Sequence, residues 1–292
     1  MAFDSIKAML SAAKQAECPL HEVICKSDCT ESGISAESSR RQMHHLWEVM
    51  KQTSAGYSAA DRSNSGLSGG EAQKIRDAAR AGKLLGGEYF TDVIEEALKT
   101  AECNACMKRI VAAPTAGSCG VIPAILLPLA EREQLPDEVV EHALYVSAGF
   151  GQVIAARASI SGAEGGCQAE VGAASAMAAA ALTYLMDGSA EQCAHAAAIA
   201  LGNLLGLVCD PVAGLVEVPC VKRNVIGAVN ALSAANMAIA GLTSRIPADE
   251  VIDAMGEVGD VMHANLRETG LGGLAGTPTA QQITEELQKP TL

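Results

Sequence analysis

SGAEGGCQAEVGAASAMAAAALTYLM, residues 161–186, decides the fold class of this chain. Its first half is rich in glycine, and its second half is a run of small residues dominated by alanine. Alanine has the highest helix propensity of all residues, and the alternating β-branched and aromatic residues of a strand are almost absent here and elsewhere in the chain. We therefore predict a helix that begins at Glu170 and ends at Met186, within an all-α fold.

The same pattern extends to both sides of this segment. Aromatic residues make up only 3% of the 292 residues, so a core of such small side chains must bring helices close together. Loops rich in Gly and Pro interrupt the pattern at 114–120, 162–166, 209–224 and 270–276. We find no internal repeat and predict one compact Ala/Gly-rich helical domain over 1–292, with the helices of about 1–60 as a peripheral part. Further helices are predicted at Ser5 to Ala16, Ser35 to Ser54, Glu71 to Ala81, Thr91 to Ala113, Ala190 to Leu207, Val225 to Thr243 and Asp249 to Arg267.

Charge and hydropathy narrow the class of protein. The formal net charge of -13 argues against a nucleic-acid partner, because phosphate binding needs clustered Lys and Arg. The opening MAFDSIKAML has no basic region followed by an apolar run, so we expect a cytoplasmic protein. The uncharged stretches 111–130 and 225–244 are long enough to span a membrane, but the first holds three prolines and the second several Asn and Ser. Buried core helices explain both stretches better, and no membrane association is expected.

Ten cysteines are many for a chain in a reducing compartment, where thiols serve as metal ligands or catalytic groups rather than as disulfides. Cys167, Cys209 and Cys220 each lie at a predicted junction between loop and helix, separated by 42 and 11 positions. Three thiolates would leave one iron of a four-iron cluster open to act as a Lewis acid on a substrate hydroxyl. From spacing alone, the alternative that these are ordinary buried thiols stays open.

Several long segments resemble one known family. APTAGSCGVIPA (113–124), SGAEGGCQAEVGAASAMAAAAL (161–182), CDPVAGLVEVPCVKRN (209–224) and RETGLGGLA (267–275) closely resemble the alpha chain of the two-subunit, iron–sulfur-dependent L-serine dehydratases, and SGLSGGEAQK (65–74) matches a further family loop. The resemblance runs across nearly the whole chain. It implies that Cys167, Cys209 and Cys220 hold a [4Fe-4S] cluster.

The resemblance also implies an activity and a partner. The expected enzyme is an oxygen-sensitive carbon–nitrogen lyase of serine catabolism and gluconeogenesis, which converts L-serine to pyruvate and ammonia without pyridoxal phosphate. Single-chain relatives carry a second domain with a Ser-rich, His-containing motif, and this chain has nothing like it. A separate beta chain is therefore implied as partner, in a heterodimer or larger assembly, with the active site near the interface.

The loop 114–120 is our candidate for binding the substrate carboxylate. Backbone N–H groups at a helix start bind carboxylates well, and hydroxyl donors add to them. The alternative is a simple capping turn, and both roles are compatible. The predicted substrate-binding residues are Thr115, Gly117, Ser118, Ser65 and Gly66, with Gly70 as a neighbour.

The base that removes the α-proton is left open by the sequence. Lys222 and His263 are the candidates, although Lys222 also fits a charge partner of an anionic cluster and a lone His is more often structural. A histidine from the beta chain is a further alternative. Glu268 is a third catalytic candidate, for holding the ammonium group or ordering the site. Arg223, Asn224, Arg267 and Thr269 are candidates for holding the ammonium group or ordering the site.

Three other interpretations were weighed. An iron–sulfur L-cysteine desulfidase would use the same cluster with sulfide as leaving group, and a non-catalytic scaffold would merely bury the cysteines. A zinc site is a weaker hypothesis, because its two cysteine pairs are 74 positions apart in sequence. That site would comprise Cys25, Cys29, Cys103 and Cys106.

Overall fold

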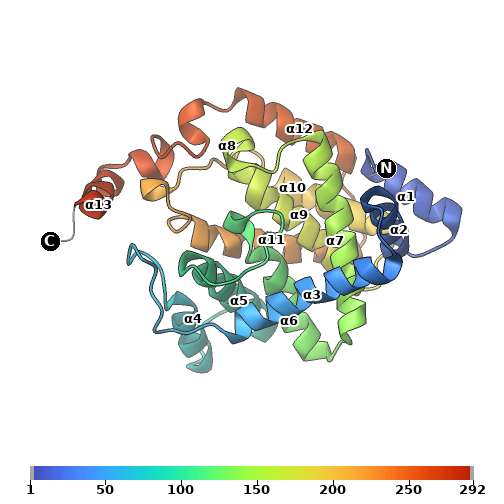
Figure 1. The fold of residues 1–292 in the computed structure, drawn as a ribbon, viewed down its shortest axis with the longest axis horizontal. Coiled ribbons are helices and arrows are strands. Elements are labelled where there is room, and N and C mark those ends of the chain that lie inside the picture. The colour runs from blue at the N-terminus through green and yellow to red at the C-terminus, as the bar shows by residue number, and fades with distance from the viewer. Residues whose placement is uncertain (1–2, 290–292) are drawn as a thin grey trace.

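The computed structural model describes residues 3–289. Within these residues it contains thirteen α-helices and no strand, apart from one isolated parallel bridge between Cys209 and Arg267. The all-α prediction is confirmed. Figure 1 shows the helices gathered around a central group, with the N-terminus near one end of the molecule and the C-terminus at the other.

The central group is built on helix α9 (Ala173–Leu185), which packs against α7 (Asp137–Arg157), α10 (Ala190–Gly202) and α11 (Cys220–Ile239). Eleven consecutive residues of α9, 173–183, are buried, and most of them are alanine. A helix buried all round must be apolar on every face, and small side chains allow its neighbours to approach closely. The alanine run therefore makes α9 the axis of the core.

A second group of helices lies below this core in Figure 1. It comprises α3 (Ala36–Ala55), α4 (Glu71–Arg80), α5 (Glu88–Ala105) and α6 (Val121–Glu133), with α5 packed on α4, α6 and α11. Trp47, the single tryptophan of the chain, is 1% exposed and anchors α3 in this apolar cluster. These helices hold the loops 57–70 and 106–120 against the start of α11.

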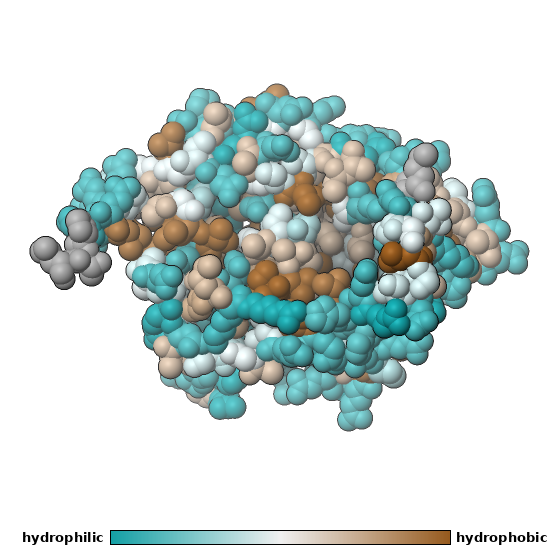
Figure 2. Space-filling model, in the orientation of Figure 1, coloured by the Kyte–Doolittle hydropathy of each residue, from teal (hydrophilic) through white to brown (hydrophobic). Residues whose placement is uncertain are grey.

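The remaining helices cover the outside. Helices α1 (Ile6–Ala16) and α2 (Leu20–Ser32) form an apolar cluster with α7, α10 and α12 (Ala248–Val261). The short α8 (Gly162–Gly165) lies next to α12, and α13 (Pro278–Gln288) packs on the turn Val212–Gly214. Figure 2 shows a largely hydrophilic rim on this face, with apolar side chains gathered across the centre and toward the end that carries α13.

Several helix boundaries differ from the predicted ones. Helix α5 ends at Ala105 rather than at residue 113, because Met107 adopts a left-handed conformation (φ 59°) that no helix continues through. Helix α11 begins at Cys220 instead of Val225, so the third cysteine belongs to its first turn. Helix α12 ends at Val261, six residues before the predicted end. Helices α2, α6, α7 and α13 had no individual predicted bounds, and the predicted loop 162–166 contains the short helix α8.

Helix α7 is, within residues 3–289, the one helix long and apolar enough to cross a membrane. In its most apolar 18-residue window, 61% of the residues are buried inside the protein. Burial to that extent is expected of a core helix. The stretch 225–244, weighed from sequence as a membrane span, lies mostly in α11, which packs on α5, α9 and α10.

Candidate metal centre

Cys167 is placed by a glycine turn and an irregular helix start. Gly166 has φ 75°, and a side chain there would meet the Leu207 carbonyl oxygen at 2.9 Å. The chain then enters one π-helical turn, Gln168–Gly172, which continues directly into α9. Such turns inside helices are frequent at functional sites. The result is a thiol that is 2% exposed, at the N-terminal end of the core helix.

Cys209 lies in an extended segment that the C-terminal part of the chain holds in place. Its N–H donates to the Leu266 carbonyl at 2.8 Å, and its carbonyl accepts from the Glu268 N–H at 2.8 Å. These two bonds form the isolated bridge and satisfy the backbone of a buried segment without a sheet. The chain between Cys167 and Cys209 contains α9 and α10, which pack against each other and return the chain to the same place.

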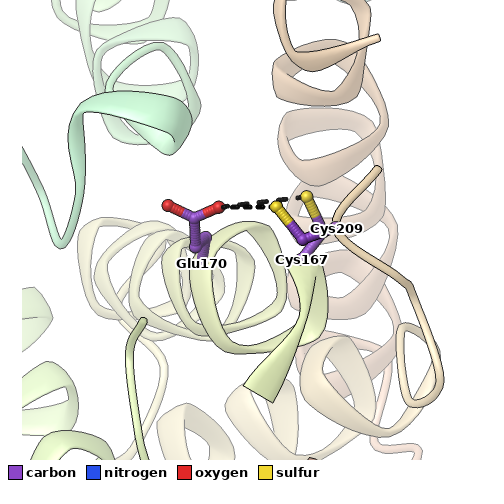
Figure 3. A group of neighbouring side chains, drawn as sticks. All are labelled: Cys167, Glu170 and Cys209. Atoms are coloured by element: carbon purple, nitrogen blue, oxygen red, sulfur yellow. Dashed lines mark hydrogen bonds between the residues drawn. The ribbon is translucent and has the colours of Figure 1, made fainter. Parts of the chain in front are cut away.

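The Glu170 carboxyl group lies close to both of these thiols. Its Oε2 atom lies 3.8 Å from the Cys209 sulfur and 4.0 Å from the Cys167 sulfur, and all three atoms lie within 4.8 Å of one another. Figure 3 shows the carboxylate pointing toward both thiols across the first turn of the helix. Sequence analysis did not select Glu170 as a site residue. The available signal was its position three residues after Cys167, which puts both side chains on one helix face.

Cys220, the third predicted cysteine, begins α11 and is 7% exposed. Burial, together with the negative charges of Cys167 and Glu170, raises the pKa of its thiol to about 12. The charges of Cys167 and Glu170 therefore act on Cys220, although Cys220 does not belong to the group of close ligand atoms. The structure brings two of the three predicted cysteines into direct proximity and places the third in the same buried region.

Arg223 supplies positive charge at this centre. Its Nη1 atom donates to the Cys167 sulfur at 3.5 Å and to the Val208 carbonyl at 2.8 Å, and it pairs with Asp210 at 2.7 Å. A hydrogen bond from the Cys209 thiol lowers the pKa of Cys167, and the Arg223 charge lowers it further, against the effect of burial. The pKa of Cys209 is raised by the same hydrogen bond.

The predicted substrate loop lies directly against Glu170. Burial raises the pKa of Glu170, and the nearby Thr115 side chain opposes this shift. A Cβ on Gly117 would lie 3.2 Å from Glu170 Oε1. Ser118 is fully buried and lies 3.1 Å from the Thr115 hydroxyl. Asn224 ties the loop to α11, since its side chain accepts from the Gly120 N–H and donates to the Gly117 carbonyl.

The second predicted loop reaches the centre indirectly. Ser65 and Ser63 donate to the two carboxylate oxygens of Glu217, at 2.8 and 2.6 Å. Glu217 is buried and precedes Cys220 by three residues, so it links the loop to the third cysteine. It is a second residue that sequence analysis did not select. Gly66 is exposed, with φ 77°, and Gly70 precedes α4.

The three predicted catalytic residues lie at different places. Lys222 is 69% exposed and pairs with Glu71 at 3.1 Å. His263 is exposed, and its Nδ1 accepts from the Asn265 N–H. Glu268 is exposed too, but its charge raises the pKa of both Cys209 and Glu170. Of the three, Glu268 is the one that acts electrostatically on the cysteine centre.

Other polar groups lie away from this centre. The hypothetical zinc ligands Cys25, Cys29, Cys103 and Cys106 belong to none of the groups of close potential ligands in residues 3–289. A groove of about 1270 Å³ runs between α3, α4, α5 and α6, and it is rich in charge. Its most buried charges already pair with one another, as Lys99 does with Glu95 and Glu96. The cysteine centre is therefore the stronger candidate for chemistry.

Comparison with known proteins gives a consistent result. The sequence profile described as "Serine dehydratase alpha chain" matches residues 14–275. A protein of Bacillus subtilis named "Probable L-serine dehydratase, alpha chain" is 47% identical, and the match covers 98% of this chain and 95% of that protein. The "L-serine dehydratase, alpha chain" of Peptoniphilus asaccharolyticus is 42% identical over 92% of this chain and 93% of the relative. "L-serine dehydratase 2" of Escherichia coli is 42% identical over 82% of this chain but only 54% of its own length.

Proposed function

Because the chain belongs to the serine dehydratase alpha chain family, we propose that it is the catalytic subunit of an L-serine dehydratase, which converts L-serine to pyruvate and ammonia. The family profile covers all the site residues, from Ser65 to Glu268. The observation that carries the proposal is the convergence of Cys167, Cys209 and Glu170 in one buried group beside the loop 114–120.

The donors present fit a metal cluster held by thiolates, and we propose a [4Fe-4S] cluster on Cys167, Cys209 and Cys220. Thiolates are the usual protein ligands of such clusters. The surroundings support this, because a Cβ on Gly162 would lie 3.0 Å from the Cys209 sulfur, so the fold keeps this space free of side chains. When bound, an iron without a cysteine ligand would act as a Lewis acid on the substrate hydroxyl.

In this mechanism the protein binds serine through its carboxylate and removes the α-proton. Thr115, Gly117 and Ser118 are proposed to hold the carboxylate through backbone N–H and hydroxyl groups, with Ser65 and Gly66 at the edge of the site. Loss of the α-proton and the β-hydroxyl gives an enamine and water. The enamine becomes an imine, and water hydrolyses it to pyruvate and ammonia.

Glu268 is the base candidate that we favour on this chain, because its charge influences the cysteine centre. Lys222 and His263 remain candidates, and a histidine from the partner chain is the alternative. A base must come within hydrogen-bonding reach of the proton, directly or through one water. In the structure Lys222 is engaged with Glu71 and exposed, which argues for a role in binding or charge balance instead.

We propose a beta chain as the partner and the cytoplasm as the location. The match to L-serine dehydratase 2 covers only 54% of that relative, which therefore contains a large additional part. The two alpha chains compared here have no such excess, with 95% and 93% of their lengths matched. A separate beta chain would supply the equivalent part.

An L-cysteine desulfidase would use the same metal ligands, so the two activities are distinguished by which substrate, serine or cysteine, the enzyme converts. The test is anaerobic purification of this chain co-expressed with its beta chain, followed by iron and sulfide analysis and a visible spectrum. We expect about four irons per chain, a broad visible band that bleaches in air, and pyruvate formation from serine in parallel. Sulfide release from cysteine without serine turnover would favour the desulfidase.

Two variants complete the test. Cys209→Ser should lose the iron and the activity together, while Cys193→Ser, which changes a fully buried thiol in α10, should keep both. A colourless protein that still converts serine would refute the cluster mechanism. A colourless and inactive complex would favour the scaffold interpretation.

A further inference from the structure

Three anionic donors converge at the centre, whereas the cluster hypothesis uses only cysteines. We infer that Glu170 is the fourth protein ligand of the metal centre, an oxygen donor to the iron that the three cysteines leave open. This inference rests on the proposed function, because it assigns a resting ligand within the same site. It also means that the substrate hydroxyl replaces a carboxylate oxygen when it binds.

The first argument is the direction of the carboxylate. Oε2 faces both sulfurs, at 3.8 and 4.0 Å, while Oε1 faces the backbone of Gly117. A side chain that served only to hold the loop 114–120 would direct both oxygens at that loop. Figure 3 shows the carboxylate aimed along the line to the two thiols. Glu170 therefore presents one oxygen to the loop and the other to the metal ligands.

The second argument is the space reserved around this carboxylate. A Cβ on Gly162 would lie 2.7 Å from Glu170 Oε2, a distance that real Cβ atoms essentially never show. A Cβ on Gly117 would lie 3.2 Å from Oε1 on the other side. The Thr115 side chain lies near enough to lower the pKa of this group. The two glycines thus restrict the position of the Glu170 side chain.

The third argument is charge. The Glu170 carboxyl group is buried beside the sulfurs of Cys167 and Cys209. As metal ligands all three groups would be deprotonated, and an uncompensated buried charge is costly. Within residues 3–289, Arg223 is the cationic side chain that hydrogen-bonds to a cysteine of this centre, and it is already shared with Asp210. A bound metal ion between the donors would compensate the remaining negative charge. Carboxylate is a harder ligand than thiolate, so a substrate oxygen would displace it more easily than a cysteine.

The test measures what occupies the open iron in the substrate-free holoenzyme. The reduced cluster of the complex is studied by electron–nuclear double resonance in water enriched in oxygen-17. If Glu170 is the ligand, the wild-type protein shows no coupling to water oxygen. Glu170→Ala should retain its iron on three cysteines and gain that coupling, because water takes the vacated position. Glu164→Ala, which changes an exposed carboxylate in the same glycine-rich segment, should behave as wild type.

The outcomes separate this inference from the proposed function. Coupling to water oxygen in the wild-type cluster would overturn the inference while leaving serine turnover and the cluster intact. Identical spectra of wild type and Glu170→Ala would overturn it as well. If Glu170→Ala fails to hold iron, the wild-type measurement alone decides. Absence of any cluster in the active wild-type complex would instead refute the proposed cluster mechanism.

Discussion

Gly162 leaves the space that Glu170 and Cys209 occupy. A methyl group at this position would overlap Glu170 Oε2 and press on the Cys209 sulfur at 3.0 Å. Overpacking of this kind costs about 1–3 kcal/mol and displaces the neighbouring groups. At the residue scale, the positions of these buried ligand atoms thus depend on the absence of a side chain at Gly162 as well as on the side chains that surround them.

We predict that Gly162→Ala lowers both the iron content and the serine turnover of the anaerobic complex by about tenfold or more, since a 1.4 kcal/mol loss at the site is a factor of ten. Gly202→Ala is the matched control, because the nearest atom to its added Cβ is at 3.9 Å. Circular dichroism checks that both variants keep their helices. Full iron content and activity in Gly162→Ala would show that this space is not needed.

Arg223 matters for stability as well as for chemistry. Its partner Asp210 is 2% exposed and also accepts from the Leu274 N–H at 2.7 Å. Removing one member of a buried ion pair leaves an uncompensated charge. We expect Arg223→Met to lower the free energy of unfolding by about 3 kcal/mol, measured by urea denaturation of the iron-free chain.

The double variant Arg223→Met with Asp210→Asn tests the cause. Because it removes both charges, it should recover a large part of the lost stability, in the manner of a double-mutant cycle. If the double variant is as unstable as the sum of two independent losses, the pair does not act as a unit.

At the scale of the elements, helices α2 and α7 meet at a contact that depends on pH. His21 on α2 stacks on His142 of α7 at 3.7 Å between ring centroids, and its Nδ1 lies 2.7 Å from the Tyr184 hydroxyl. Burial and the charge of His142 together lower the pKa of His21 to about 4, although Glu22 and Glu138 oppose this shift. The contact between α2 and α7 therefore favours the neutral imidazole.

The sign of the effect follows from this direction. Below the ordinary pKa of 6.5, His21 is protonated in the unfolded chain but stays neutral in the folded protein. The free energy of unfolding therefore decreases as the pH falls from 6.5 toward about 4. Since His21 is only half-buried and water screens it, we expect a loss of about 1 kcal/mol near pH 5. Urea unfolding at pH 7.5 and pH 5 measures it. His21→Asn should show a smaller pH dependence, and an unchanged one would contradict the assignment.

At the scale of the whole molecule, alanine sets the distances between the central helices. Ala178 and its neighbours on α9 have no exposed surface and face helices on several sides. A larger side chain has no room there without moving a helix. We predict that Ala178→Leu lowers the free energy of unfolding by about 2–3 kcal/mol, whereas Ala155→Leu on the exposed face of α7 changes it by less than about 0.5 kcal/mol. Equal stabilities would show that the core is loosely packed.

Helix α9 and the cysteine-bearing loops were predictable because their signals are local. An alanine run indicates a helix directly, and Gly and Pro indicate breaks near 162–166 and 209–219. Within these predicted loops the structure nevertheless forms the single turn α8 and, from Cys220 on, the start of α11. The end of α5 at Ala105 was not predictable, since residues 106–113 include good helix formers and the break depends on the left-handed Met107. The start of α11 at Cys220 was missed for a related reason, because Pro219 fits both a loop and the position before a helix.

The sequence by itself determined the all-α class, the alanine-rich core and the family, because composition and long motifs are properties of the chain alone. Only the tertiary structure decided which side chains meet. It put Glu170 beside Cys167 and Cys209 (Figure 3). It also put Arg223 beside Cys167, and Lys222 against Glu71. The physical reason is that neighbouring residues of α11 point in different directions, and that the packing of α9, α10 and α11 brings distant positions together.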